Sequence, residues 1–295
     1  MTRAERLALG SIAVGAIVLG VKLLAWWVTG SAALFSDAAE TVVNVAAAAV
    51  SLLALRLAAK PADADHPYGH DKAEFFAAVI EGALIVAAAL VILDQAWRTY
   101  QTPVPIAHGG VGAALNGAAT VINLGWALLL RRRGRQLRSP ALLADAQHIF
   151  SDVVTAIGAI IGVGLVMVSG VLWLDPLVAA LIAGYVLLSG GFVIRSSVDG
   201  LMDSAPAPAV VARIRALVAE HAEGAIEAHD LRTRHAGRLT FLEFHLVVPG
   251  SLTVSAAHII CDRIEAALKA EMEGLMITIH VEPEGKAKHL GIMVL

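Results

Sequence analysis

The sequence has few of the residues that build the surface and the cross-links of a soluble protein. Only 16% of its 295 residues are charged and 58% are hydrophobic, with a mean hydropathy of +0.73, whereas about a quarter of the residues of a soluble protein are charged. The single cysteine, Cys261, excludes an internal disulfide framework and fits a reducing compartment. The net charge of −3 identifies no partner, and we expect no nucleic acid. This composition is typical of an integral membrane protein.

Long apolar runs fill the first two thirds of the chain. Six of them reach the roughly 20 residues that a helix needs to cross a bilayer. They are residues 7–28, 32–57, 75–97, 110–130, 141–169 and 171–194. The charged start of the chain could open a signal peptide, but the length of the first run and the runs that follow favour a retained first span. We expect an all-α six-helix transmembrane bundle over residues 1–204 and a separate domain over residues 205–295.

Positive charges lie at alternate ends of the predicted spans. Lys and Arg are concentrated at the N-terminus and after the second, fourth and sixth runs, and are nearly absent from the other connections. The residues are Arg3, Arg6, Arg56, Lys60, Arg131, Arg132, Arg133, Arg135, Arg138 and Arg195. By the positive-inside rule this predicts that both termini are cytoplasmic. We expect an integral protein of the plasma membrane, the inner membrane in a bacterium.

The region after Pro206 alternates between helical and strand periodicity. It predicts helices at 210–221 and 253–272 and strands at 226–234, 239–248 and 275–282, with a turn at 235–237. The order αββαβ indicates a cytoplasmic α+β domain of the ferredoxin-like or metallochaperone-like kind. Two helices are expected to cover one face of a three-stranded sheet.

Polar side chains recur in the second and fifth apolar runs at the same spacing, three residues and then four. They are Asp37, Glu40, Asn44, Asp145, His148 and Asp152. This spacing puts the side chains of each run on one helical face. Ionisable groups are costly in a bilayer and are functional candidates there. If the two faces meet, they bring carboxylates, an imidazole and an amide oxygen to one point; the alternative is a set of hydrogen bonds between helices.

Three other polar residues within the spans have simpler interpretations. Lys22 and Asn123 are expected to pack between helices or to extend toward the membrane surface. Glu81 is explained equally well as a salt-bridge partner as by a functional role.

Two further clusters lie outside the predicted spans. The connection after the second run contains Asp63, His66 and His70, which suit a transition metal; a solvated acidic turn is the alternative. The last domain contains four histidines and a carboxylate within some 50 residues, for which exposed histidines are the alternative. These residues are His229, His245, His258, His280 and Glu282.

Four segments in this order resemble the cation diffusion facilitator family. They are residues 30–38 (GSAALFSDA), 66–74 (HPYGHDKAE), 148–152 (HxxxD) and 229–234 (HDLRTR). The resemblance runs from the first span to about Glu282. It implies a homodimeric antiporter that exchanges a divalent metal ion for protons and requires no enzymatic activity.

The resemblance also implies site residues, position by position. The transport site would consist of Glu40, Asn44, His148 and Asp152. The loop site would consist of Asp63, His66 and His70. The cytoplasmic site, shared with the dimer partner, would consist of His229, His245, His258, His280 and Glu282. Lys72 and Asp203 would form a salt bridge near the dimer seam.

The chain departs from the zinc-type pattern of the family at two ligands in the membrane and one in the soluble domain. Glu40 stands where zinc-type members have Asp or His, and Asn44 stands where they have Asp. Glu282 stands where a shorter Asp is common. Asp37 and Asp145 are expected near the ion without binding it. Zinc remains the expected ion, with manganese, iron, cobalt and cadmium as alternatives because the donor set is rich in oxygen.

Two other functions compete with transport. An intramembrane metalloenzyme would also use His and carboxylate ligands, but the sequence has no His-Glu-x-x-His motif and no evident general base. A membrane-anchored metal sensor would not need matching polar faces in two spans. Both alternatives predict a protein that moves no ions.

Overall fold

The computed structural model describes residues 1–29, 32–102, 110–289 and 291–293. Within these ranges it leaves out the side chains of residues 29, 32–37, 39, 40, 110–113, 163 and 167. The chain forms two compact units, Met1–Val198 and Asp199–Leu295.

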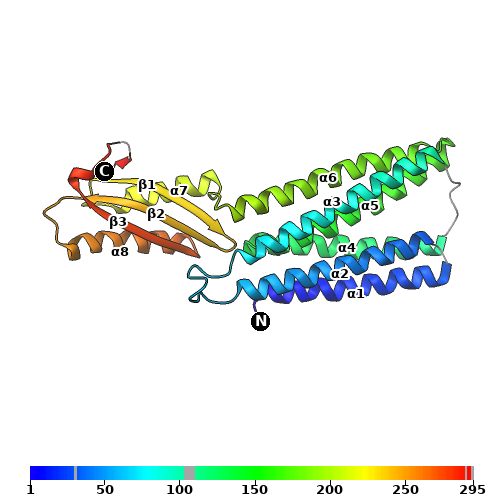
Figure 1. Ribbon diagram of the computed structural model, residues 1–295, viewed down its shortest axis with the longest axis horizontal. Coiled ribbons are helices and arrows are strands. Elements are labelled where there is room, and N and C mark those ends of the chain that lie inside the picture. The colour runs from blue at the N-terminus through cyan, green and yellow to red at the C-terminus, as the bar shows by residue number, and fades with distance from the viewer. Residues whose placement is uncertain (30–31, 103–109, 290, 294–295) are drawn as a thin grey trace. The chain divides into compact units, whose positions relative to one another are not determined.

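Six long helices form the first unit (Figure 1). They are α1 (Arg3–Thr29), α2 (Ala32–Ala58), α3 (Ala73–Gln101), α4 (Gly110–Leu137), α5 (Pro140–Ser169) and α6 (Leu174–Leu201). The helical bundle is confirmed, and its helices differ from the predicted spans at several ends. α4 continues through the arginine cluster to Leu137, and α6 begins at Leu174 because the chain first turns at Gly170, whose φ of 74° ends α5.

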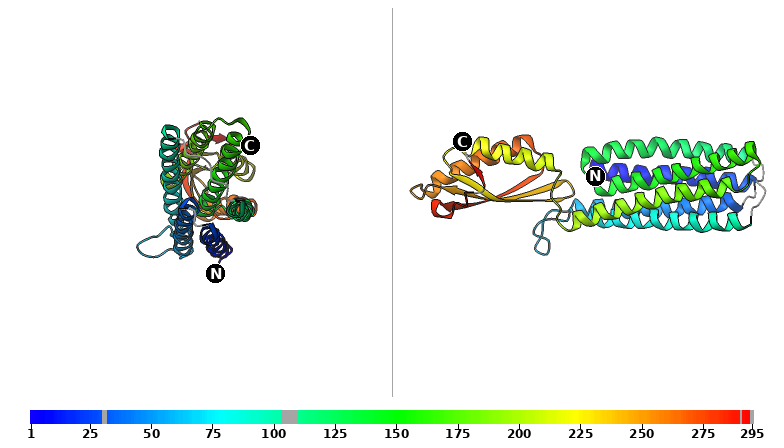
Figure 2. Two further views of the ribbon diagram at one scale, coloured as in Figure 1. Left: turned by 90° about the vertical axis from the view of Figure 1, so that its right-hand side faces the viewer. Right: turned by 90° about the horizontal axis from the view of Figure 1, so that it is seen from above.

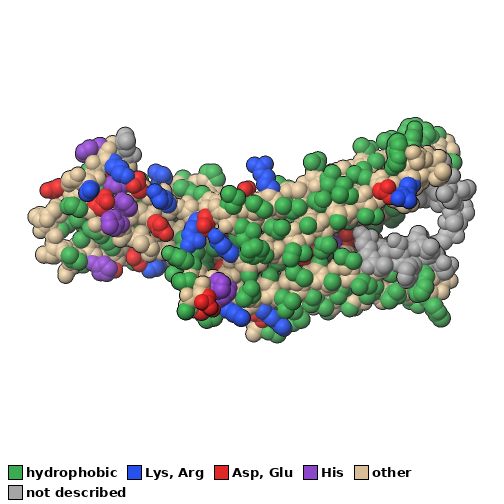
Figure 3. Space-filling view, in the orientation of Figure 1, with side chains coloured by type: hydrophobic (Ala, Val, Ile, Leu, Met, Phe, Trp, Pro, Cys, Tyr) green, Lys and Arg blue, Asp and Glu red, His purple; other side chains and the backbone are tan. Residues whose placement is uncertain are grey.

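The outer surface of this bundle is apolar (Figure 3). Large hydrophobic side chains such as Leu188 and Val168 are 77% and 91% exposed, as suits a surface that faces lipid. Within the described residues, α1, α2, α3, α5 and α6 are long and apolar enough to cross a membrane. The interior is filled mainly by small residues that let helices approach closely.

The second unit is a sheet with two helices on one face (Figure 2). Its elements are α7 (Pro208–His221), β1 (Glu227–Ala236), β2 (Leu239–Val248), α8 (Val254–Glu271), β3 (Leu275–Pro283), a 3-10 turn (Glu284–Lys286) and β4 (Ile292–Met293). The strand order is β3-β2-β1-β4, with β1–β2 and β1–β4 antiparallel and β2–β3 parallel. The three predicted strands are confirmed, and a short fourth strand adds to the sheet. Among the described residues β4 pairs with Glu227 and Ala228, and it is too short to show a periodicity.

One face of the sheet is covered and the other carries the histidines. Phe244 and Leu246 on β2 pack with Ile214 of α7 and Ile264 of α8 in the buried core, which also contains Cys261. Because side chains alternate along a strand, His245 lies on the opposite face.

Candidate metal-binding sites

The polar faces of α2 and α5 meet inside the bundle. Nε2 of His148 lies 2.8 Å from Oδ1 of Asn44, and the Asn44 amide nitrogen donates a hydrogen bond to Oδ2 of Asp152. The Asn44 amide thus links the two α5 side chains, and three of the four predicted transport ligands are brought together. The side chains of Glu40 and Asp37 lie outside the described residues.

Glu81 of α3 contacts His148 of this cluster. Its Oε2 lies 3.1 Å from Nδ1 of His148, and the two side chains are 1% and 7% exposed. Ser51 of α2 donates a hydrogen bond to the other Glu81 oxygen at 3.2 Å. Glu81 therefore pairs with a histidine rather than with Lys or Arg, and sequence spacing alone gives no sign of this because α3 has no matching polar face.

Asp145 is also buried but has different partners. Ser11 of α1 donates a 2.6 Å hydrogen bond to Oδ2 of Asp145, and Trp126 of α4 donates a 2.9 Å hydrogen bond to the Ser11 hydroxyl. This chain ties α5 to α1 and α4 beside the His148 cluster. Asp145 thus lies near the predicted site and has a role in connecting helices.

A cavity of about 430 Å³ reaches the cluster. Asn44 and Asp152 line it, together with polar side chains of α1 and α4 that include Lys22 and Asn123. Its other lining residues, among them Gln95 near the end of α3, lie toward the helix ends remote from the α2–α3 connection. The structure therefore places Lys22 and Asn123 in the wall of this cavity.

The α2–α3 connection holds the loop cluster. His66 Nδ1 and His70 Nε2 lie 3.4 and 3.5 Å from the two oxygens of Asp63, and the two rings are 4.4 Å apart. The backbone N–H of His66 donates to Asp63 at 2.8 Å, and this bond, aided by the nearby imidazoles, holds the pKa of Asp63 below its ordinary value. The three predicted ligands are thus adjacent, with a carboxylate that stays ionised near neutral pH.

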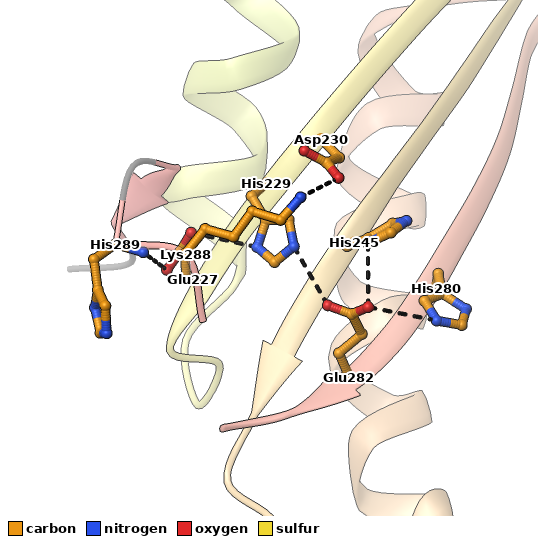
Figure 4. A network of polar contacts seen from close by, with 8 residues as sticks. All are labelled: Glu227, His229, Asp230, His245, His280, Glu282, Lys288 and His289. Carbon is orange, nitrogen blue, oxygen red and sulfur yellow. Dashed lines mark hydrogen bonds and ion pairs between the residues drawn. The ribbon is translucent and has the colours of Figure 1, made fainter. Parts of the chain in front are cut away.

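The third cluster crosses three strands of the sheet (Figure 4). His229, His245 and His280 occupy one rung of β1, β2 and β3. Glu282 contacts all three imidazoles, at 3.3 Å from His229 Nε2, 3.3 Å from His245 Nδ1 and 3.7 Å from His280 Nε2. Four of the five predicted ligands therefore converge on one point.

These atoms fit a bound cation. Both ring nitrogens of His229 and Nδ1 of His245 are buried and make no hydrogen bond with any described residue, although buried polar atoms in proteins are nearly always paired. Asp230, which sequence reasoning missed, places a carboxylate oxygen within 4.8 Å of the His229 and His245 ligand atoms. It sits at a bulge in β1 with φ of 51°, a feature that the periodicity does not reveal.

His258 does not join this cluster within the chain. It lies on α8, its side chain is 72% exposed, and its Nε2 is 3.6 Å from Asp262 one turn later. Lys72 and Asp203 belong to different units, so their pairing stays a prediction. Within its own unit Asp203 contacts Arg234 at 3.2 Å.

Glu227 contacts the sheet cluster through His229. It is fully buried, its Oε1 lies 3.3 Å from Nδ1 of His229, and its Oε2 accepts a 2.9 Å hydrogen bond from the backbone of His289. Burial acts to raise the pKa of Glu227, but the His289 backbone bond and the His229 imidazole outweigh it and lower that pKa. Sequence reasoning missed Glu227 because its partner arrives from the C-terminal segment.

Comparison with known proteins identifies the family. A family model described as "Cation efflux transmembrane domain" matches residues 8–202, and one described as "Cation efflux protein, cytoplasmic domain" matches residues 206–284. The chain belongs to the cation diffusion facilitator family. Cation diffusion facilitators are integral membrane transporters, so α1–α6 form the membrane domain and the α+β unit is the cytoplasmic domain. The expectation that the chain is no enzyme agrees with this membership.

Relatives of this cation diffusion facilitator cover nearly all of it. "Uncharacterized transporter sll1263" of Synechocystis sp. is 41% identical over 273 residues, which are 92% of this chain and 88% of the relative. "Cation-efflux pump FieF" of Shewanella oneidensis is 32% identical over 274 residues, or 92% of each chain. A solved "Metal-bound C-terminal domain of CzcD transporter from Thermotoga maritima" is 27% identical, covering 27% of this chain and 93% of that one, with a TM-score of 0.25.

Proposed function

We propose that the chain exports a divalent transition metal from the cytoplasm in exchange for protons, with zinc as the preferred ion. The observation that carries this proposal is the contact of Asn44, His148 and Asp152 inside the bundle, at the edge of a cavity whose wall includes polar side chains. Charged groups at such a depth typically mark an ion pathway.

Proton exchange follows from the chemistry of these donors. A divalent ion requires an ionised carboxylate and an imidazole nitrogen without a proton, so protons and metal compete for the same atoms. The atom of His148 that faces Asn44 is Nε2, and imidazole ordinarily changes charge near neutral pH. Metal loaded from the cytoplasm is released when protons enter from the opposite side, and the inward proton gradient drives export.

The donor types favour zinc over magnesium or calcium. His148 supplies nitrogen and Asp152 supplies oxygen, a combination that suits zinc and related ions, whereas all-oxygen sites suit the alkaline earth metals. Glu40 is the fourth proposed ligand, on the same helical face as Asn44. Because Asn44 supplies a neutral oxygen in place of a carboxylate, manganese, iron, cobalt and cadmium remain competing substrates.

The cytoplasmic domain is proposed to bind resident metal and to hold two copies together. Glu282 and three imidazoles would hold an ion at the edge of the sheet, and the ion would link β1, β2 and β3. His258, remote from this cluster in its own chain, would reach the corresponding cluster of the partner in a homodimer. We take residues 205–295 as this domain and residues 1–204 as the transport domain.

The arrangement in the membrane follows from the positive charges. Arginines at the end of α4 and beside the ends of α2 and α6 support a cytoplasmic location of both termini. The cavity near the opposite helix ends would then open to the outside of the inner membrane.

Ion uptake by proteoliposomes tests the proposal. Zinc, manganese, iron, cobalt and cadmium are supplied separately, with and without a pH gradient across the vesicle membrane. We expect saturable zinc flux that the gradient accelerates, with lower rates for the other ions. A purified, folded protein that moves none of these ions would overturn transport in favour of a sensor or an intramembrane enzyme.

A further inference from the structure

Glu81 and His148 form a buried pair inside the bundle. Glu81 Oε2 and His148 Nδ1 are 3.1 Å apart, and neither atom makes a hydrogen bond with another described residue. The other edge of the same imidazole faces Asn44, through Nε2 at 2.8 Å. The ring is therefore held between a carboxylate on α3 and an amide on α2.

The carboxylate is itself fixed in place. Ser51, which is fully buried, donates a 3.2 Å hydrogen bond to Oε1 of Glu81. The next residue, Gly82, packs so closely on α6 that an added Cβ would lie 2.7 Å from the Ile194 side chain and 3.2 Å from the Gly190 carbonyl oxygen. α3 is thus in close contact with α6 at the level of Glu81.

An imidazole binds a cation only through a nitrogen that carries no proton. A carboxylate beside one ring nitrogen keeps the proton on that nitrogen and leaves the lone pair on the other, and it also makes the ring a stronger donor. In this chain the carboxylate lies at Nδ1 of His148 and keeps a proton there. Nε2 faces the Asn44 oxygen and donates to it, so an ion that binds through Nε2 takes the place of that proton.

We propose that Glu81 is a positioning residue of the transport site: it holds His148 with Nδ1 protonated and Nε2 directed at the metal ion. This inference rests on the proposed function, because it assumes that His148 binds the transported ion. It adds a residue of α3 to a site whose ligands come from α2 and α5.

Three variants of the full-length protein test this role. Glu81→Gln keeps the size of the side chain and an oxygen acceptor but removes the charge, Glu81→Leu removes both, and Glu81→Asp keeps the charge. Since partners of this kind typically change metal affinity about 10–100-fold, we expect the KM for zinc to rise about tenfold in Glu81→Gln and more in Glu81→Leu. Glu81→Asp should restore part of the affinity.

The matched control is Ser189→Ala. It removes the 2.7 Å hydrogen bond that Gln147 of α5 donates to Ser189 of α6, one residue away from His148, without touching the imidazole. We expect its zinc KM to equal that of the wild type. A loss of packing alone would affect this control as much as Glu81→Gln, and would lower the maximal rate rather than raise KM.

A spectroscopic measurement reads the imidazole directly. In zinc-loaded protein labelled with 15N-histidine, the signals that vanish in His148→Ala belong to His148, and they should show a protonated Nδ1 in the wild type. We expect this signature to shift or broaden in Glu81→Leu. If wild-type transport depends on His148 but Glu81→Gln changes neither zinc KM nor these signals, the positioning role is wrong; if the wild type transports nothing, the proposed function fails instead.

Discussion

The clusters in the membrane and in the sheet differ in how they satisfy their polar atoms without an ion. In the bundle, the atoms that would face the ion bond to one another: His148 Nε2 to Asn44, and Asn44 to Asp152. In the sheet, both nitrogens of His229 are buried without a hydrogen bond. The first arrangement pairs the proposed ligand atoms with one another, which suits a site that must release its ion. We expect an ion bound by these nitrogens to stabilise the second arrangement, because a buried unpaired polar atom costs about 1–3 kcal/mol.

The largest expected effect separates the two clusters by flux. Asp152→Ala removes the anionic ligand of α5, and we expect zinc flux to fall to the background of empty liposomes while zinc still stabilises the cytoplasmic domain. Asp94→Ala is the control. Asp94 is an exposed carboxylate of α3, and among the described residues it pairs with Arg98 one turn along the same helix. Near-normal flux through folded Asp152→Ala would remove this residue from the transport site.

The converse variant is Glu282→Ala. Glu282 joins three imidazoles, so its loss should abolish the zinc-dependent stabilisation of the cytoplasmic domain, which amounts to about 2.7 kcal/mol at a hundredfold excess of zinc over Kd. All tryptophans and tyrosines lie before residue 199, so intrinsic fluorescence does not report on the cytoplasmic domain. Calorimetry of the full chain measures the stabilisation instead. Glu271→Ala, which only removes a pair with Arg213 on the surface, should keep the full zinc effect. If zinc stabilised Glu282→Ala and Glu271→Ala to the same extent, Glu282 would not belong to a metal site.

A third variant converts the bridging amide of the membrane cluster into a second charge. Asn44→Asp adds a carboxylate that must lose a proton before it binds metal, so we expect tighter zinc binding, a steeper dependence on pH and a shift of selectivity toward zinc. The ion panel in proteoliposomes measures all three. Unchanged selectivity together with a lower melting temperature would show that Asn44 serves only as a hydrogen-bond link between α2 and α5.

The smallest expected effect concerns the C-terminal segment beside the sheet cluster. Lys288 pairs with Asp230, and this contact lowers the pKa of Asp230. A lowered pKa contributes stability above the ordinary value and loses it as pH falls through the value in the folded state. Lys288→Ala should therefore lower the melting temperature of the metal-free domain slightly at pH 7, and the difference should shrink as the pH falls below the ordinary pKa of an aspartate and through its lower pKa in the folded state. A difference that grows on acidification would exclude the Asp230 pair as its source.

Sequence predicted most of the fold because both units obey simple periodicities. Apolar runs gave the six helices, and alternation gave β1, β2 and β3 within a few residues. It missed β4, since two residues contain no pattern. The polar spacing correctly brought together Asn44, His148 and Asp152, but Glu81 and Glu227 escaped it. Glu81 contacts a histidine of another helix, and Glu227 accepts a hydrogen bond from the C-terminal segment, so only the tertiary structure reveals these contacts.

Cys261 has a practical consequence for spectroscopy and labelling. It is the only thiol in the chain, it lies on the buried face of α8 with 4% of its surface exposed, and burial raises its pKa. Thiol reagents act on the thiolate, so the folded wild type should be almost inert to maleimides. The natural sequence is thereby close to a cysteine-free background. A single Thr120→Cys in the cavity wall would carry a fluorophore or spin label that reports when the cavity opens to water.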